Sequence, residues 1–161
     1  MLNIAYLQLG SNLGNRLQHI EHAKMAIIKD VGIILKSSAI YETAAWGLTV
    51  QPDFLNSVIQ ISTRFDPFTL LDNLLHIETN LGRVRKEKWA PRTIDIDILF
   101  YNHLIIKCTE LEIPHPFVHL RKFVLIPLTE LNGDLVHPVL NLTISEILHQ
   151  CSDESHVTLY K

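Results

Sequence analysis

The segment from Thr93 to Ile98 alternates polar and apolar residues, and this alternation constrains the fold more than any other stretch. A period of two predicts a β-strand with one buried face. On such a strand the carboxylates of Asp95 and Asp97 project from the same side, roughly 7 Å apart at about 3.3 Å per residue. Two neighbouring carboxylates repel each other, so a cation between them would keep both ionised. Mg²⁺ suits such a pair, because it takes one or two carboxylates and completes its coordination with phosphate and water.

A cationic segment stands directly before this strand. Its net charge is +4, whereas the whole chain has a net charge of −3. A cationic loop that leads into two carboxylates on an otherwise acidic protein favours binding of a polyphosphate with its metal. The alternative is a solvated basic loop beside an edge strand with an acidic exposed face. The charged residues of this segment are Arg83, Arg85, Lys86, Glu87, Lys88 and Arg92.

The length and composition indicate one globular domain, residues 1–161, with enough apolar material for a core. The acidic balance argues against nucleic-acid binding, which needs a basic face. No apolar run is long enough to span a membrane, and the first residues predict a strand in place of a signal peptide. Cys108 and Cys151 fit no metal or redox motif, so we expect a cytoplasmic protein with reduced thiols.

The apolar spacing predicts an α+β fold. A strand–helix–strand–strand–helix–strand order is typical of the ferredoxin-like βαββαβ unit, in which helices flank an antiparallel sheet. The expected strands are 4–10, 33–42, 54–63 and the Asp-x-Asp strand. The expected helices have apolar stripes over 17–28 and 70–81 and end at Gly32 and Gly82.

Smaller features complete the expected topology. Ser11 or Asn12 could cap the first helix, and Asp66 with Pro67 predicts the start of the second. Residues 104–106 are expected to pair with the Asp-x-Asp strand as a hairpin. Two further helices are expected over 120–130 and 143–150, with a short strand in the tail.

The motif Lys88-x-Ala90-Pro91-Arg92-x-x-Asp95-Ile96-Asp97-Ile98-Leu99 resembles the signature of the 6-hydroxymethyl-7,8-dihydropterin pyrophosphokinase family. The resemblance covers about residues 4–148, and it implies an ATP-dependent diphosphotransferase of folate biosynthesis. Such an enzyme transfers pyrophosphate to the dihydropterin hydroxymethyl group and releases AMP, with two Mg²⁺ ions bound with the ATP. We expect it to be a monomer. Further family motifs are Gly10-Ser11-Asn12-Leu13, Gln51-Pro52-Asp53-Phe54-Leu55-Asn56, Gly82-Arg83-Val84-Arg85 and Pro114-His115-Pro116.

The resemblance also implies roles for individual residues. The catalytic group is Arg83, Arg92, Asp95 and Asp97, and the two aspartates are the metal ligands. The ATP-binding group is Glu78, Arg85, Trp89, Arg92, Ile98, His115 and Arg121. The pterin-binding group is Thr43, Ala44, Trp46, Phe54, Asn56, Asp95 and Phe123.

Some of these roles have simpler alternatives. A lone phenylalanine is more often a core residue, and His115 could be a surface histidine on a loop. Asn56 fits a core less well, because a buried amide needs partners. Glu110 and Glu112 depart from some family members, and they would weaken the nucleotide site if they face the phosphates.

Three other functions share parts of this pattern. A nucleotidyltransferase could use the same aspartate pair, but it would release pyrophosphate in place of AMP. Ferredoxin-like domains also serve as regulatory ligand-binding modules, which would not need paired carboxylates beside a cationic loop. An RNA-binding module is disfavoured by the acidic balance and by the lack of a basic aromatic sheet motif.

Overall fold

The computed structural model describes residues 1–45, 50–84 and 90–161. In this part of the chain, one six-stranded sheet has the order β5-β1-β4-β3-β8, and β2 pairs with β4 beside β3. Its strands are β1 (Asn3–Ser11), β2 (Gly32–Ser37), β3 (Tyr41–Thr43), β4 (Phe54–Thr63), β5 (Asp95–Tyr101) and β8 (Val157–Leu159). Every pairing is antiparallel, which confirms the predicted antiparallel sheet.

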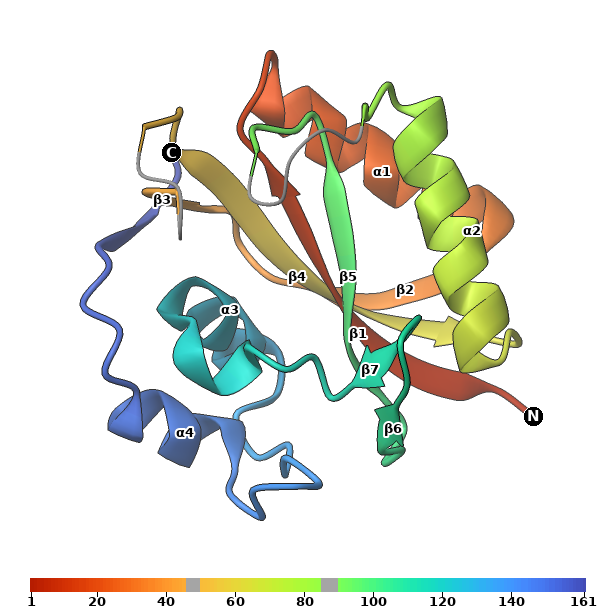
Figure 1. Cartoon of the computed structure of the whole chain (residues 1–161), viewed down its shortest axis with the longest axis vertical. Helices are drawn as coiled ribbons and strands as arrows, with labels where there is room; N and C mark the ends of the chain where they lie inside the picture. The colour runs from red at the N-terminus through yellow and green to blue at the C-terminus, as the bar shows by residue number, and fades with distance from the viewer. Residues whose placement is uncertain (46–49, 85–89) are drawn as a thin grey trace.

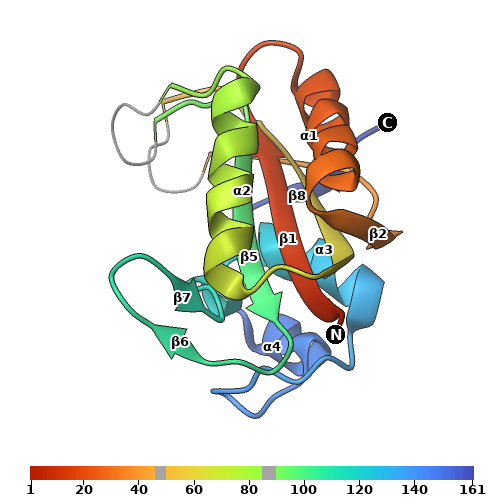
Figure 2. The ribbon, with the colours of Figure 1, turned by 90° about the vertical axis from the view of Figure 1, so that its right-hand side faces the viewer.

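Helices cover both faces of this sheet. The helices α1 (Arg16–Asp30) and α2 (Pro67–Asn80) lie side by side on one face, and α3 (Lys122–Asn132) and α4 (Ile144–Gln150) lie on the other (Figures 1 and 2). A short hairpin of β6 (Ile106–Lys107) and β7 (Glu112–Ile113) and one turn of 3₁₀ helix (Val118–Leu120) connect β5 to α3. The predicted α+β fold with two C-terminal helices is confirmed.

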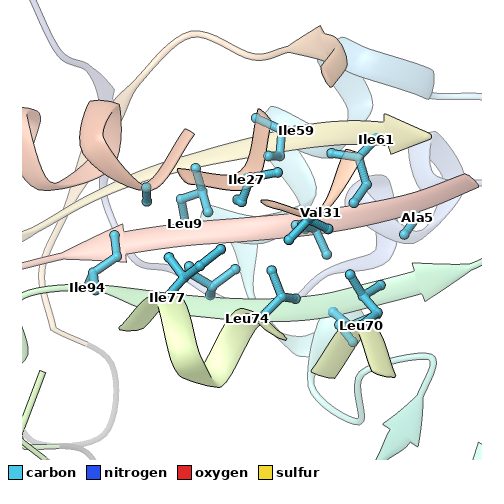
Figure 3. Packing of buried hydrophobic residues seen from close by; sticks show 14 of the residues in the cluster. Ala5, Leu9, Ile27, Val31, Ile59, Ile61, Leu70, Leu74, Ile77 and Ile94 are labelled. Carbon is cyan, nitrogen blue, oxygen red and sulfur yellow. The ribbon is translucent and has the colours of Figure 1, made fainter. Parts of the chain in front are cut away.

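Two hydrophobic clusters hold the layers together. Between the sheet and α1 and α2, side chains such as Leu9, Ile27 and Leu74 interlock, as Figure 3 shows. On the other face, α3 and α4 pack on Tyr6 and Phe100. The period-two pattern of the strands thus places alternate side chains in two separate cores, and the ends of the central strands remain available for polar residues.

The second predicted strand is interrupted. Residues 38–40 lie outside both β2 and β3, and two backbone N–H groups in or opposite this stretch donate to side chains. The backbone N–H of Val58 donates to Ser38 Oγ at 2.9 Å, and that of Ala39 donates to Glu130 Oε1 at 3.0 Å. A pattern of apolar residues cannot reveal this exchange.

Two other local predictions were wrong. Residues 104–106 do not pair with β5, since β6 pairs with β7. The first helix is capped by Asn15, whose side chain accepts from the N–H of Gln18, while Ser11 continues β1. The Asp66 cap and Pro67 at the start of α2 are confirmed.

Gly32 follows α1 as predicted. The need for glycine there comes from close packing against β4 and not from a left-handed backbone conformation. A Cβ atom there would lie 2.2 Å from the carbonyl oxygen of Ser62 on β4. Gly82, in contrast, has φ +89°, the left-handed conformation that glycine tolerates. Among the described residues, no helix is long and apolar enough to cross a membrane.

Candidate active site

An inner pocket lies where β1 ends and where β4 and β5 begin, on the α3 face of the sheet. Gly10 on β1 is paired with Asn56 on one side and with Asp95 on the other. A Cβ atom at Gly10 would lie 3.1 Å from Asn56 Oδ1, so the glycine leaves space that a side chain would fill. The pocket is lined by Gln8, Gly10, Thr43, Ala44, Phe54, Asn56, Arg92, Asp95, Asp97, Arg121 and Phe123.

Asn56 is buried in this pocket, and only the oxygen of its side-chain amide has a hydrogen-bond partner among the described residues. Its Oδ1 accepts from Gln8 Nε2 at 3.2 Å, whereas its Nδ2 has no hydrogen-bond partner among the described residues. A buried donor without a partner costs about 1–3 kcal/mol. Because the donor belongs to a pocket-lining residue, a ligand that offers an acceptor would remove this cost.

A larger outer cleft of about 630 Å³ opens beside the inner pocket. It runs from the end of α2 past Pro91 and β5 to His115 and Phe117. Four residues line both cavities, and we call them the shared wall: Arg92, Asp95, Asp97 and Arg121. A group bound in one cavity can therefore reach a group bound in the other across the two carboxylates.

Asp95 is held by two guanidinium groups. Arg83 Nη1 lies 2.7 Å from its Oδ1, and Arg92 Nη1 lies 2.9 Å from its Oδ2. Arg83 also contacts the buried Glu78 at 2.8 Å, and the same Oε1 of Glu78 accepts from the N–H of Ile96 at 2.7 Å. Glu78 thus fixes both the arginine and the start of β5.

Asp97 and His115 form a pair with shifted protonation. Burial, reinforced by the nearby charge of Asp95, raises the pKa of Asp97 to about 8. Burial and the charge of Arg121 lower the pKa of His115 to about 4, so its imidazole is neutral at pH 7. His115 Nδ1 accepts from the N–H of Phe117 at 3.2 Å, which leaves the proton on Nε2, 4.0 Å from Asp97 Oδ2.

Arginine side chains cover the aromatic rings of the inner pocket. The guanidinium carbon of Arg92 is 5.5 Å from the ring centre of Phe54, and that of Arg121 is 5.7 Å from that of Phe123. The free volume of the pocket is only about 40 Å³ in this arrangement. A flat ligand between the two phenylalanines would have to take the place of these cations.

The structure brings most of the predicted site residues to the two cavities. The described members of the predicted pterin group all line the inner pocket, and those of the predicted ATP group all line the outer cleft. Glu110 and Glu112 line the outer cleft as well. Trp46, Arg85 and Trp89 lie outside the described residues.

Three polar or small positions on and after β1 were not predicted as site residues. Gln8 orients Asn56, Gly10 leaves space, and Asn12 contacts the loops on both sides of the strand. A glutamine among the apolar residues of a central strand was the one signal in the sequence that could have indicated this. Gly10 and Asn12 also belong to a stretch that resembles the family, but neither residue was assigned a role in the site, and Asn12 was considered only as a helix cap.

The pair of carboxylates, Asp95 and Asp97, could supply some of the ligands of a hard divalent cation but not all of them. Among the described residues, no group of three or more His, Cys, Asp or Glu side chains could hold a metal ion. Two carboxylates alone suit Mg²⁺ that brings its own phosphate and water ligands. The raised pKa of Asp97 is consistent with this, because an added cation would favour its ionised form.

Comparison with known proteins identifies relatives along nearly the whole chain. The chain is 39% identical to the 2-amino-4-hydroxy-6-hydroxymethyldihydropteridine pyrophosphokinase of Haemophilus influenzae, over 96% of this chain and 97% of that protein. It is 42% identical to the protein of the same name from Bacillus subtilis, over 81% of this chain and 79% of that protein. It is also 46% identical to the folic acid synthesis protein fol1 of Pneumocystis carinii, over 92% of this chain, but it spans only 20% of that longer protein.

Solved structures agree in fold. A crystal structure of HPPK-DHPS in complex with substrates superposes with a TM-score of 0.77 over 92% of this chain and 43% of that chain, at 17% identity. The wild-type HPPK-DHPS of Plasmodium falciparum gives a TM-score of 0.76 over 93% of this chain and 43% of that chain, at 19% identity.

The family model of 7,8-dihydro-6-hydroxymethylpterin-pyrophosphokinase (HPPK) matches residues 6–133. This range contains every residue that lines the inner pocket and the outer cleft. Together with the relatives from Haemophilus influenzae and Bacillus subtilis, both named pyrophosphokinases, this match shows that the chain belongs to the HPPK family and is a pyrophosphokinase.

Proposed function

We propose that the chain transfers the pyrophosphoryl group of ATP to the hydroxymethyl group of 6-hydroxymethyl-7,8-dihydropterin and releases AMP, as a step of folate biosynthesis. The observation that carries this proposal is the shared wall. Asp95 and Asp97 stand between a narrow aromatic pocket and a larger cleft with several arginines, which suits one flat and one polyanionic substrate. We also propose that the chain acts as a monomer in the cytoplasm, which light scattering and cell fractionation would test.

The pterin ring would occupy the inner pocket between Phe54 and Phe123. Flat heteroaromatic rings stack well on aromatic faces, and the guanidinium groups that now lie over this pair would have to move away. Asn56 Nδ2 would donate to an acceptor on the edge of the ring. Thr43 and Ala44 would complete the wall, and we retain Trp46 in the pterin group as a proposal.

The nucleotide would occupy the outer cleft. Arg121 and His115 line this cleft, and the guanidinium group and the Nε2–H are donors that would suit phosphate or ribose oxygens. Glu78 and Ile98 line its wall near β5. The resemblance adds Arg85 and Trp89 to this group, and they stay part of the proposal.

Two Mg²⁺ ions, bound with the ATP by Asp95 and Asp97, would supply charge neutralisation for the phosphates and lower the cost of deprotonating the hydroxymethyl group. Asp97 would serve as a ligand in its ionised form, which a bound cation would favour against the raised pKa that this carboxyl has beside Asp95. Arg83 and Arg92 start from contacts with Asp95 and would neutralise charge on the phosphates as these groups bind.

The transfer itself balances without a covalent enzyme intermediate. The hydroxymethyl oxygen forms a bond to the β-phosphorus, the bond from that phosphorus to the oxygen shared with the α-phosphate breaks, and AMP leaves with this oxygen. The hydroxyl proton passes to solvent. The shared wall contains carboxylates and guanidinium groups, whose role here is to position and neutralise the reacting groups.

An assay of AMP release from Mg·ATP, with and without the dihydropterin, tests the proposal. We expect AMP only when both substrates are present. Asp97→Asn should lower kcat by at least about 1,000-fold, and Asp72→Asn on the exposed side of α2 serves as the matched control. Release of pyrophosphate would indicate a nucleotidyltransferase, and Mg²⁺-independent ATP binding without turnover would indicate a binding module.

A further inference from the structure

Asn12 follows directly after β1 and is almost completely buried, with 1% of its surface exposed. Its side chain forms hydrogen bonds in two directions. The Oδ1 atom accepts from the backbone N–H of Arg92 at 2.8 Å. The Nδ2 atom donates to Gln51 Oε1 at 2.8 Å and to the carbonyl oxygen of Pro52 at 3.0 Å. One amide therefore joins two segments that are 40 residues apart in sequence.

The position of β1 in the sheet explains this bridge. Because β1 lies between β4 and β5 in the sheet, the residue that follows β1 has a neighbouring segment on each side. One is the segment that leads into β4, and the other is the segment that leads into β5. Pro52 stands two residues before Phe54, and Arg92 stands three residues before Asp95. The backbone N–H of Asn12 also donates to the carbonyl of Arg92 at 3.2 Å, so a second hydrogen bond joins Asn12 to the segment before β5.

We propose that Asn12 is a positioning residue for the transfer reaction, which sets Arg92 and the pterin-facing Phe54 in a fixed relation to each other. Asn12 lines neither the inner pocket nor the outer cleft, so it would act only through the segments that it holds. The proposal rests on the proposed function, in which Phe54 stacks on the pterin and Arg92 contacts the phosphates. Asparagine suits this place, because its short amide both accepts and donates.

A purely structural role would give a different result. If Asn12 only stabilised the fold, Asn12→Ala would lower the melting temperature but leave kcat of the folded protein unchanged. The matched control is Asn132→Ala on α3, which removes a hydrogen bond from Nδ2 to Tyr6 Oη at 3.0 Å between two residues that line neither cavity. Both variants lose an asparagine amide, and only one of these amides contacts the two loops.

We expect Asn12→Ala to lower kcat for AMP release by about 10- to 100-fold, because small displacements of reacting groups have effects of this size. Asn132→Ala should keep kcat within about twofold of the wild-type value. In an Arg92→Ala background, the added Asn12→Ala change should lower kcat by a smaller factor than it does in the wild type. Equal factors in the two backgrounds would overturn the proposal, as would an unchanged kcat for Asn12→Ala.

Amide hydrogen exchange tests the bridge without reference to activity. In Asn12→Ala, exchange should accelerate in residues 50–54 and in residues 90–95 together, whereas Asn132→Ala should leave both segments unchanged. Acceleration on one side only would contradict the joint positioning. If the wild-type protein released no AMP, the proposed function would fail, but the exchange result would still show whether Asn12 joins the two segments.

Discussion

Glu78 offers the sharpest test of how the site is held together. Its Oε1 accepts from the N–H of Ile96 at 2.7 Å and contacts Arg83 at 2.8 Å, and its side chain is 3% exposed. Glu78→Ala would leave the N–H of Ile96 without this acceptor, which costs about 1–3 kcal/mol. It would also remove one of the two carboxylates that form ion pairs with Arg83 among the described residues, and because Asp95 remains at 2.7 Å we assign about 1–2 kcal/mol to that loss.

The two losses together lie between about 2 and 5 kcal/mol of unfolding free energy, and we take about 3 kcal/mol as the expected value. For a chain of this size, each kcal/mol shifts the melting temperature by about 2–4 °C, so Glu78→Ala should melt roughly 6–12 °C below the wild type. Thermal unfolding followed by circular dichroism measures this shift. Glu78→Gln keeps an oxygen for the N–H of Ile96 and should lose about a third as much.

Two outcomes would refute this reasoning. A melting temperature of Glu78→Ala within about 2 °C of the wild type would mean that neither hydrogen bond matters for stability. Equal losses in the alanine and glutamine variants would mean that the Ile96 contact contributes nothing. The Glu78→Gln variant also separates stability from binding, because a direct contact with the nucleotide would raise the Kd for ATP while the melting temperature changes little.

Three further predictions follow from particular contacts. Gly10→Val should weaken pterin binding by about 10- to 100-fold in calorimetry, because a branched side chain would fill the inner pocket, and an unchanged Kd would show that the ring binds elsewhere. Since burial and Arg121 lower the pKa of His115 from 6.5 to about 4, unfolding free energy should fall as the pH falls through this window, and His115→Gln should flatten that part of the pH profile in urea unfolding. Gly32→Ala should destabilise the fold by roughly 3 kcal/mol in urea unfolding, because its Cβ would collide with the carbonyl of Ser62, and a loss below 1 kcal/mol would contradict that geometry.

The sequence contained enough information for the sheet, the helices and the location of the site. The Asp-x-Asp alternation predicted β5, and the apolar spacing predicted α1 and α2, because burial on one face imposes these periods on the chain. The two C-terminal helices were also expected, and α3 and α4 confirm them. The second strand was wrong as one element, since Ser38 and Glu130 supply side-chain hydrogen bonds where a ladder was expected. Such exchanges depend on which residues meet in three dimensions.

Some site residues could be predicted from the sequence, and others could be found only in the structure. Charged residues near the motif, such as Asp97 and Arg92, were predicted from sequence because their chemistry is visible in their composition and spacing. The contributions of Gln8, Gly10 and Asn12 were not, because they depend on register: a glycine matters only once Asn56 and Asp95 are known to lie on either side of it. The shifted pKa of Asp97 also depends on burial that the sequence does not reveal.

The glycine at the base of the inner pocket has a consequence for drug resistance. A compound whose ring rests on Gly10 and accepts from Asn56 would use the same surface that we assign to the natural substrate. Any side chain introduced at Gly10 to exclude that compound would also crowd Asn56 and exclude the substrate. Escape mutations at this residue would therefore also weaken binding of the dihydropterin.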